Sequence, residues 1–554
     1  MGVVLTGRDL GIGHRNRLLR RWRPALTFLA VALVALMLVR WMQVRAGAEH
    51  SSFGAYPDEP SHYLSGLMVR DYIADGFPGP PVKFAVNYYL HIPFFAVGHW
   101  PPLFYILEAL WMILIGQSHS AVLWLIASIT ALVAATIFQE ARRFVGVPGA
   151  ACAGLLFCWM PDVHWSNNLV MTDTSVALLS LWAALLLGRY LDRGRPAFAF
   201  GFGLLAGLTI LTKYSGLFLA VLPLSAVVLC RRWGLLRRWS FWLQFAVIAM
   251  IVLPWVALTH RYARSGLEPS QLMSFNKVES YAKLLLLQNG SGLGILLMLC
   301  WILTLLHWRK LSGMEGVLFL QVPAVLLLIM AAPVGVEGRY LIPAFPPLLL
   351  LMCFTIRRLS DWAKIRQVVF ARPWATAILV AFTLFYGRSE LLSFPHVPPN
   401  EMRPIVDFVL QSKDLRKASI LVPANAEGPM IAEFAMRDPA RAERILARPN
   451  KLLSRTDWMG TEYQVYYTTP SEAEQYFEQN PIDLVIVRKL PQGKVLPAEF
   501  FLAAGVKQYP ERWKSVAEFP GKEGGYEVFQ FARPAVWNQP TPFFVERLTS
   551  SLGN

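Results

Sequence analysis

The feature that most constrains this chain is a succession of apolar runs, each close to the length of a membrane-spanning helix, separated by short clusters of basic residues. A helix needs about 20 consecutive apolar residues to cross the hydrocarbon core of a bilayer. The predicted spans are residues 24–44, 120–140, 147–162, 173–190, 198–212, 214–230, 240–259, 291–308, 314–332, 340–357 and 372–388. The sequence therefore predicts a polytopic membrane protein with an all-α membrane domain, residues 24–390.

The composition agrees with this prediction and argues against other classes. Hydrophobic residues make up 55% of the chain and charged residues 16%, a balance that ordinary soluble domains do not show. The net charge of +16 would suit nucleic acid, but clusters between apolar runs are typical of cytoplasmic loops, so we expect no nucleic-acid partner. All five cysteines fall in or beside apolar runs, which argues against a disulfide framework and cysteine-rich metal motifs.

The basic clusters set the predicted orientation, because cytoplasmic loops are enriched in lysine and arginine. With the basic N-terminus, residues 1–23, in the cytoplasm, the predicted spans place every cluster inside. The clusters are Arg142/Arg143, Arg189/Arg193/Arg195, Arg231/Arg232/Arg237/Arg238, Arg309/Lys310 and Arg357/Arg358/Lys364/Arg366. The odd number of spans then places the C-terminal region outside. The first run resembles a signal peptide, but we favour an uncleaved span because so many spans follow.

Residues 45–119 form the first outer loop of this topology. The segment 101–116 is apolar enough to span, but counting it alone reverses the later basic clusters, so we interpret it as a juxtamembrane or membrane-embedded helix. An extra pair of spans stays open, which gives about 11–13 transmembrane helices. After Asp58, a candidate N-cap, apolar residues recur at helical spacing, which predicts a second juxtamembrane helix with an acidic start.

A region of ordinary polarity follows the last span. Residues 391–400 are predicted to be a linker and residues 401–554 a small extracytoplasmic α/β domain. The predicted strands are Ser419–Val422, Ile482–Val487 and Tyr526–Phe531, and the predicted helices are Glu427–Met436 and Ser471–Gln479. No grouping of nucleophile and base or of metal ligands stands out there, so this domain is expected to dock an acceptor or cover a site.

The predicted topology brings the ionisable residues outside the basic clusters to the outer face. The candidate site residues are Asp58, Glu59, His62, His99, Asp173, Lys213, Tyr214, Arg339 and Tyr340. Each also has a plain structural explanation. Asp173 can cap its helix, Lys213 can extend from the membrane to the interface, and Arg339 can pair with Glu337. Their concentration on one face favours a site.

The stretches that contain these candidate residues occur over residues 20–360 in the order found in the C superfamily of membrane glycosyltransferases, and the chain resembles that superfamily. The resemblance is strongest to the branch of protein O-mannosyltransferases, lipid A aminoarabinose transferases and galacturonosyltransferase-like enzymes. The matching elements are Asp58-Glu59, the His-Trp-Pro-Pro-Leu-Phe-Tyr element at 99–105, Val170-Met171-Thr172-Asp173, residues 207–213 and Arg339-Tyr340-Leu341-Ile342-Pro343. One departure is that some relatives carry Glu-Lys-Pro where this chain has His99-Trp100-Pro101, so a zinc site that uses that glutamate does not carry over, although His99 could replace it.

The resemblance implies a polyprenyl-phosphate sugar donor and a lipid, glycan or protein acceptor on the outer side of a bacterial inner membrane. It assigns Asp58 the role of base or metal ligand and Asp173 that of a second acidic residue. Transfer with a phosphate leaving group needs a carboxylate to accept the acceptor proton and cations beside the phosphate, which Lys213 and Arg339 would supply. One in-line carboxylate predicts inversion at the sugar carbon. A divalent cation shared by Asp58 and Asp173 is an alternative.

A transporter or flippase of a lipid-linked glycan is the main competing function. Transporters show internal repeats and ionisable residues at mid-span. We find no repeat here, and the charges gather at one face, which favours the enzyme. A glycine-containing segment at 290–294 is interpreted as a helix entry rather than a phosphate loop, because no strand precedes it.

Overall fold

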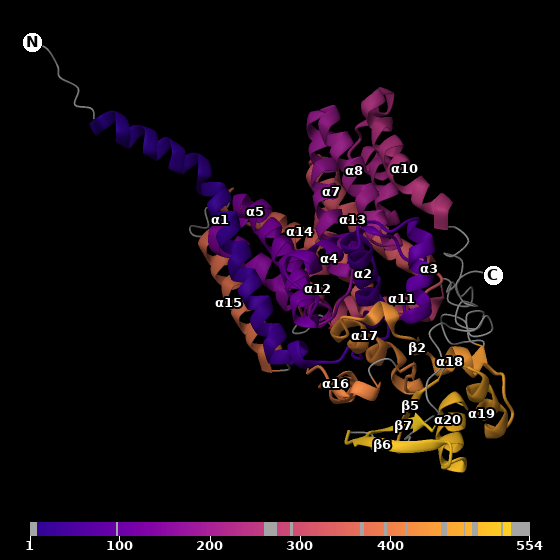
Figure 1. The fold of residues 1–554 in the computed structure, drawn as a ribbon. Coiled ribbons are helices and arrows are strands. Elements are labelled where there is room, and N and C mark those ends of the chain that lie inside the picture. Colours follow the sequence, from indigo (N-terminus) through magenta and orange to yellow (C-terminus); the bar gives the residue numbers. More distant parts are fainter. Residues whose placement is uncertain are drawn as a thin grey trace, which may run out of the picture.

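The computed structural model describes residues 8–95, 98–259, 274–288, 292–365, 371–392, 396–415, 418–455, 463–480, 482–489, 497–521 and 524–532. A large helical domain carries a smaller domain with a β-sheet at one end (Figure 1). Residues 289–291 and residues 260–273 of the predicted outer loop 260–290 lie outside the described residues. The described part of the glycine-containing segment 290–294 enters a helix as predicted, with Gly292 at the N-cap of the helix that begins at Leu293.

The helical domain confirms the predicted all-α membrane architecture. Its helices are α1 (Arg8–Ala46), α5 (His119–Trp159), α7 (Asp173–Arg193), α8 (Pro196–Thr212), α9 (Leu222–Leu229), α10 (Trp239–Thr259), α12 (Leu293–Leu305), α13 (Gly313–Ala331), α14 (Phe345–Ile365) and α15 (Ala371–Leu392). The 3₁₀ turns η2 (Tyr214–Ala220) and η7 (Gly338–Ala344) precede α9 and α14. Among the described helices, six are long and apolar enough to cross a membrane, and shorter apolar helices account for the other predicted spans.

Two predicted spans, 120–140 and 147–162, correspond to the two helical arms of α5, which a non-helical residue separates. Gly146 stands at the bend with φ 74° and ψ 179°, a conformation that glycine adopts without the penalty a side chain would bring. Pro148 follows, so the chain restarts a helix after the bend. The second arm ends at Trp159 and a separate short helix, α6 (Pro161–Asn167), leads to α7. The break at Gly146 thus confirms the two separate helical spans that the sequence predicted.

Close helix packing builds the membrane core. A side chain on Gly203 of α8 would collide with the Gln244 backbone on α10, so these helices approach through small residues. Large apolar side chains such as Met250, Leu306 and Ile378 stay exposed on the outer surfaces of the helices. Because a soluble protein rarely exposes contiguous apolar surface, these faces are suited to contact lipid.

The described part of the predicted first outer loop contains α2 (Glu59–Ala74), α3 (Pro81–His91) and α4 (Leu103–Leu114). The sequence predicted α2 and α4 as juxtamembrane helices, but it did not predict α3. The predicted segment 101–116 is therefore α4. Helix α2 packs on α4, and Gly66 faces Glu108 so closely that a Cβ would collide with its carboxylate. The loop is a folded layer between the membrane helices and the C-terminal domain (Figure 1).

The C-terminal domain is a mixed α/β unit. Its helices are α16 (Arg403–Gln411), α17 (Glu427–Arg437), α18 (Pro449–Leu452), α19 (Pro470–Gln479) and α20 (Pro497–Gln508). Its five-stranded sheet has the order β2 (Leu446–Ala447), β1 (Ile420–Leu421), β5 (Leu484–Arg488), β7 (Tyr526–Phe531) and β6 (Trp513–Phe519). The first three strands are parallel and the last three antiparallel. A separate hairpin pairs β3 (Ser454–Arg455) with β4 (Gln464–Val465). Every strand and helix predicted from the sequence coincides with one of these elements.

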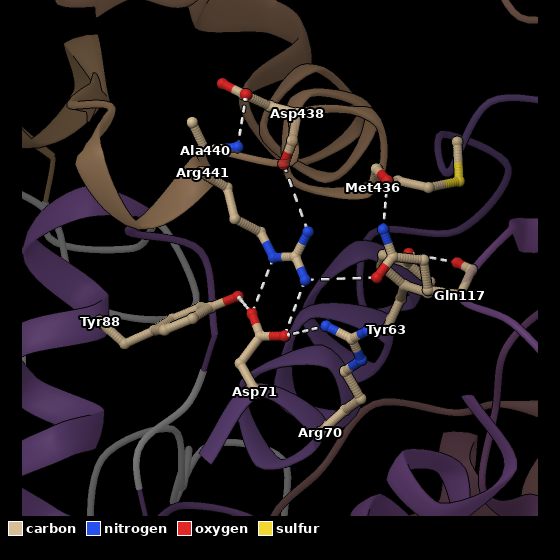
Figure 2. Close-up of polar contacts among 9 residues, drawn as sticks. All are labelled: Tyr63, Arg70, Asp71, Tyr88, Gln117, Met436, Asp438, Ala440 and Arg441. Atoms are coloured by element: carbon tan, nitrogen blue, oxygen red, sulfur yellow. Dashed lines mark hydrogen bonds and ion pairs between the residues drawn. The ribbon is translucent and has the colours of Figure 1, made fainter. Parts of the chain in front are cut away.

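The domain is joined to the first outer loop by a buried polar network (Figure 2). Arg441 donates to both carboxylate oxygens of Asp71 on α2, at 2.7 Å each, and Tyr88 donates to the same carboxylate at 2.9 Å. Gln117 donates to the Met436 carbonyl at 2.8 Å. These bonds hold α17 and the turn after it against the predicted first outer loop. The contact on α2 is made at Asp71, in the last turn of that helix.

Candidate active site

Four charged side chains meet where the first outer loop covers the membrane helices. Asp58 precedes α2, Asp173 is the first residue of α7, Lys213 follows α8 and Arg339 lies in η7. Arg339 Nη2 lies 2.9 Å from Asp58 Oδ2, and Lys213 Nζ lies 2.6 Å from Asp173 Oδ1. Arg339 Nη1 is also 3.8 Å from Asp173 Oδ2, so it links the two pairs. Residues separated by up to 281 positions thus form one cluster of two anions and two cations.

Local backbone features aim these side chains at one another. Asp58 occupies the N-cap of α2, with Pro60 in the first turn as predicted, but its side chain makes no capping hydrogen bond. The carboxylate is therefore available to Arg339. Asp173, in contrast, is not the N-cap of its helix as the sequence allowed, because Thr172 occupies that position. Gly338 brings η7 against α6, because a Cβ there would collide with the Asp162 carboxylate.

Aromatic residues surround the Arg339 guanidinium. It lies 4.4 Å from the Tyr56 ring centroid and 5.2 Å from that of Tyr340, and it donates to the Tyr56 hydroxyl at 3.0 Å. Tyr56 in turn donates to Glu337 at 2.7 Å. The pairing of Arg339 with Glu337 that the sequence allowed is thus relayed through Tyr56. Burial raises the pKa of Tyr56, which keeps it a neutral donor.

A cavity of about 60 Å³ opens beside this cluster. It is lined by Asp58, His62, Trp100, Pro101, Tyr105, Thr172, Thr212, Lys213, Arg339 and Tyr340. His62 stacks on Trp100 with ring centroids 4.1 Å apart, and its Nδ1 is 2.8 Å from the Tyr105 hydroxyl. Burial lowers the pKa of His62, and the positive charges of Lys213 and Arg339 lower it further. His62 is therefore a neutral side chain that packs against Trp100 and Tyr105 and adds no charge to the cavity wall.

Several candidates from the sequence lie elsewhere. Glu59 is fully buried and points away from the cavity, accepting hydrogen bonds from His119 Nε2 at 2.9 Å and the Val170 amide at 3.1 Å. His99 packs edge-on against Trp100, and Tyr214 packs against the membrane core. Asp173, 2% exposed, lies behind Lys213 and does not line the cavity. The cavity wall therefore brings together Asp58, His62, Lys213, Arg339 and Tyr340, while Asp173 belongs to the charged cluster without lining the cavity.

Sequence reasoning did not select Tyr56, Trp100 or Tyr105 as site residues, although Trp100 and Tyr105 stand inside the element at 99–105 that carried the resemblance and Tyr56 stands two positions before Asp58. The available signal was their position beside Asp58 and His99. An aromatic ring in a juxtamembrane loop is ordinarily explained by the membrane interface, so only the tertiary contacts distinguish these rings.

The geometry does not suit a divalent cation held jointly by Asp58 and Asp173. Arg339 contacts both carboxylates, and Lys213 takes the remaining oxygen of Asp173, so an ion between them would lie beside two cations. Within the described ranges no three histidine, cysteine, aspartate or glutamate side chains gather as metal ligands. His99 is not grouped with other candidate ligands there either.

Comparison with known proteins agrees with the fold. The sequence profile of the dolichyl-phosphate-mannose-protein mannosyltransferase family matches residues 99–257, a stretch that includes His99, Asp173 and Lys213. No curated protein matches the chain. The profile covers less than half of the chain, so it marks similarity to this family over that stretch.

Solved structures share the whole architecture. ArnT from Cupriavidus metallidurans in the apo state superposes with a TM-score of 0.59 at 16% identity, over 91% of this chain and 97% of ArnT. ArnT bound to undecaprenyl phosphate gives 0.57 at 15% identity, over 92% and 98%. The archaeal oligosaccharyltransferase AglB from Archaeoglobus fulgidus, in complex with an inhibitory peptide and a dolichol-phosphate, gives 0.50 at 12%, over 94% and 77%. The predicted resemblance is confirmed at the level of the fold, and over residues 99–257 at the level of sequence.

Proposed function

We propose that this protein is an integral membrane glycosyltransferase that moves a sugar from a polyprenyl-phosphate donor to an acceptor on the outer side of the membrane. The observation that carries the proposal is the cavity in which one carboxylate, Asp58, adjoins two cations, Lys213 and Arg339. The family profile at 99–257 and the undecaprenyl phosphate bound to ArnT support the donor class.

The cavity residues have the charges that this reaction needs. The acceptor hydroxyl oxygen forms a bond to the anomeric carbon while the bond from that carbon to the phosphate oxygen breaks. The proton of the hydroxyl passes to the Asp58 carboxylate, and the bonding electrons leave with the phosphate. Lys213 and Arg339 stabilise the charge that develops on the phosphate. Because Asp58 is the cavity carboxylate and Asp173 is held by Lys213, the arrangement favours a single in-line displacement with inversion.

The ion pair between Arg339 and Asp58 suggests an order of substrate binding, in which the donor binds before the acceptor. A donor phosphate that binds Arg339 competes with Asp58 for the same guanidinium, which is 2.9 Å from the carboxylate. Once released from Arg339, the Asp58 carboxylate is free to accept a hydrogen bond and the proton from the acceptor hydroxyl. The side chain of Asp58 is 30% exposed, so it has room to turn toward an acceptor. Donor binding thus prepares the base for the acceptor.

We further propose that the site and the C-terminal domain face the outer side, because the basic clusters gather at the opposite ends of the helices. Cysteine labelling with an impermeant reagent tests this orientation. Ser61 is buried and unsuitable, whereas Asp75 at the end of α2 and Arg237 in the 3₁₀ turn η3 (Trp233–Arg237) are both exposed. In intact spheroplasts a cysteine at Asp75 is expected to label and one at Arg237 is not. The reverse pattern would overturn the orientation.

Transfer in proteoliposomes tests the activity itself. Purified protein is supplied with a radiolabelled polyprenyl-phosphate sugar and a membrane extract as acceptor source, and release of polyprenyl phosphate is followed together with sugar transfer. Release that depends on Asp58 supports the enzyme. Movement of intact donor across the bilayer, with no cleavage of the sugar-phosphate bond, would instead establish the transporter or flippase.

A further inference from the structure

A second cavity lies at the other end of the membrane domain. It has a volume of about 400 Å³ and is enclosed by α5, α7, α13 and α14. Five arginines line it: Arg143, Arg189, Arg193, Arg357 and Arg358. Helix α7 runs from Asp173, at the candidate active site, to Arg193, at this cavity. At 1.5 Å per residue, this places the two sites about 30 Å apart, close to the thickness of the hydrocarbon core.

The charges of this cavity are only partly balanced. Glu140 pairs with Arg189 and Glu315 with Arg358, each at 2.7 Å, while Asp192 accepts the Gly313 amide at 2.7 Å. Three carboxylates therefore line the cavity with five arginines, and Arg357 also lies 3.5 Å from Asp361 just outside it, which leaves a surplus of one positive charge. Such a surplus attracts an anion, and more strongly here than in bulk water because part of the lining is apolar.

Two arginines have binding capacity to spare. Arg358 Nη1 is buried and has no hydrogen-bond partner among the described residues, although the other Nη donates to Glu315. Arg143 contacts no carboxylate in the described part of the chain, and its side chain stands at the exposed rim. A buried guanidinium nitrogen without an acceptor is costly, so an acceptor supplied from outside the chain would stabilise the cavity.

We propose that this cavity binds the phosphate headgroup of an anionic phospholipid of the inner leaflet. Guanidinium groups match the oxygens of a phosphodiester, and basic pockets between membrane helices at the cytoplasmic side recognise such headgroups. Phe144, Leu318, Leu350 and Phe354 also line the cavity and give the glycerol backbone and upper acyl chain an apolar wall. A soluble phosphate compound would share the arginine contacts but gain nothing from this wall. The inference is independent of the activity proposed for the other face.

Binding of defined lipids to the purified full-length protein tests the proposal. Delipidated protein is titrated with dioleoyl phosphatidylglycerol, dioleoyl phosphatidylcholine or inorganic phosphate, and bound ligand is counted by native mass spectrometry. The wild type is expected to bind phosphatidylglycerol at least about 10-fold more tightly than phosphatidylcholine, the effect of one or more charge-assisted hydrogen bonds. Phosphatidylglycerol is also expected to raise the unfolding temperature, whereas inorganic phosphate at millimolar concentration does not displace it.

The decisive variant is Arg143→Gln, because among the described residues this exposed side chain has no carboxylate partner whose loss would disturb folding. It is expected to weaken phosphatidylglycerol binding about 10-fold, and Arg143→Gln with Arg358→Gln to abolish the preference over phosphatidylcholine. Arg237→Gln, an exposed arginine outside the cavity, is the matched control and should bind like the wild type. Equal lipid preference in wild type and both variants, or displacement by inorganic phosphate, would overturn the proposal.

Discussion

Lys213 and Asp173 form a buried ion pair, with Lys213 Nζ 2.6 Å from Asp173 Oδ1, at the point where α7 begins and α8 ends. Asp173 is 2% exposed and has Arg339 as a second cationic neighbour at 3.8 Å. Such a carboxylate is engaged by two cations and is shielded from an acceptor. Asp58 lines the active-site cavity, which Asp173 does not. Its side chain is partly exposed, and Arg339 is its only ion-pair partner among the described residues. The two aspartates therefore differ in what they can do.

Asp58→Asn is the direct test of the proposed base. It should lower kcat by about 10²–10⁴-fold, because the acceptor proton loses its destination. Donor affinity should hold or increase, since the Arg339 Nη2 that pairs with Asp58 no longer faces a competing carboxylate when phosphate binds. Steady-state transfer kinetics and binding of the donor measure both effects. Asp75→Asn, at the exposed other end of α2, is the control and should leave both unchanged. Full activity in Asp58→Asn would exclude this residue as the base.

Lys213 has two expected roles, which a double-mutant cycle separates. Lys213→Ala should lower kcat/KM by about 10- to 150-fold if it binds the donor phosphate, the effect of losing a charge-assisted hydrogen bond. It should also destabilise the protein, because Asp173 is left buried beside one cation fewer. Adding Asp173→Asn should restore much of the unfolding temperature but not kcat/KM. Recovery of both together would mean that Lys213 acts only as the partner of Asp173.

Glu59 is expected to support the structure rather than react. It is fully buried and joins α2 to α5 and to the segment before α7 through His119 and the Val170 amide. Glu59→Ala should lower the free energy of unfolding by about 3–5 kcal/mol, as expected when one partner of a buried polar pair is removed. Molecules that remain folded should keep their kcat. Thermal unfolding in detergent, with transfer activity normalised to folded protein, measures the two quantities. A loss of kcat at unchanged stability would return Glu59 to the reaction.

The contact between Asp71 and Arg441 should hold the C-terminal domain on α2. Burial alone would raise the pKa of Asp71, but the hydrogen bonds and charge of Arg441 leave it lowered, so the carboxylate stays ionised in the pair. Arg441→Ala is expected to cost about 3–5 kcal/mol of stability, and Asp71→Ala with Arg441→Ala less than the sum of the single changes. Lys283→Ala, in the exposed pair with Glu279, is the control and should cost under about 1 kcal/mol. Additive effects would argue against direct coupling.

His62 should make stability depend on pH. Because its pKa is lowered in the folded protein, the unfolded chain binds a proton below about pH 6.5 that the folded protein rejects. The contribution of neutral His62 is complete above pH 6.5 and is lost as the pH falls below that value. Intrinsic tryptophan fluorescence during heating should show a smaller fall in unfolding temperature from pH 7.5 to 5 in His62→Gln than in the wild type. His307→Gln, at an exposed position, should behave like the wild type. Identical pH profiles for His62→Gln and wild type would contradict this assignment.

The sequence alone determined the class of fold, because hydrophobic length and charge position are local properties that a bilayer acts on directly. Each predicted span falls on a helix, and the strands predicted at 482–487 and 526–531 coincide with β5 and β7. The sequence also predicted Asp58, His62, Lys213 and Arg339, four of the residues that line the cavity, because they stand in stretches whose order resembles that of a known family. Charge at the edge of an apolar run is visible without a structure.

Only the tertiary structure decided which way those charges point. Asp58 and Glu59 are adjacent and chemically alike, yet one lines the cavity with Arg339 and the other is buried against His119. The turn of about 100° between neighbouring positions of a helix sends them to different surroundings, and those are built from residues tens to hundreds of positions away. The same holds for Asp173 and for Tyr56, whose roles depend on Lys213 and Arg339 arriving from other helices. The energy of an ion pair or hydrogen bond depends on the distance between its two partners in the folded protein. The local sequence pattern around either partner does not reveal that distance.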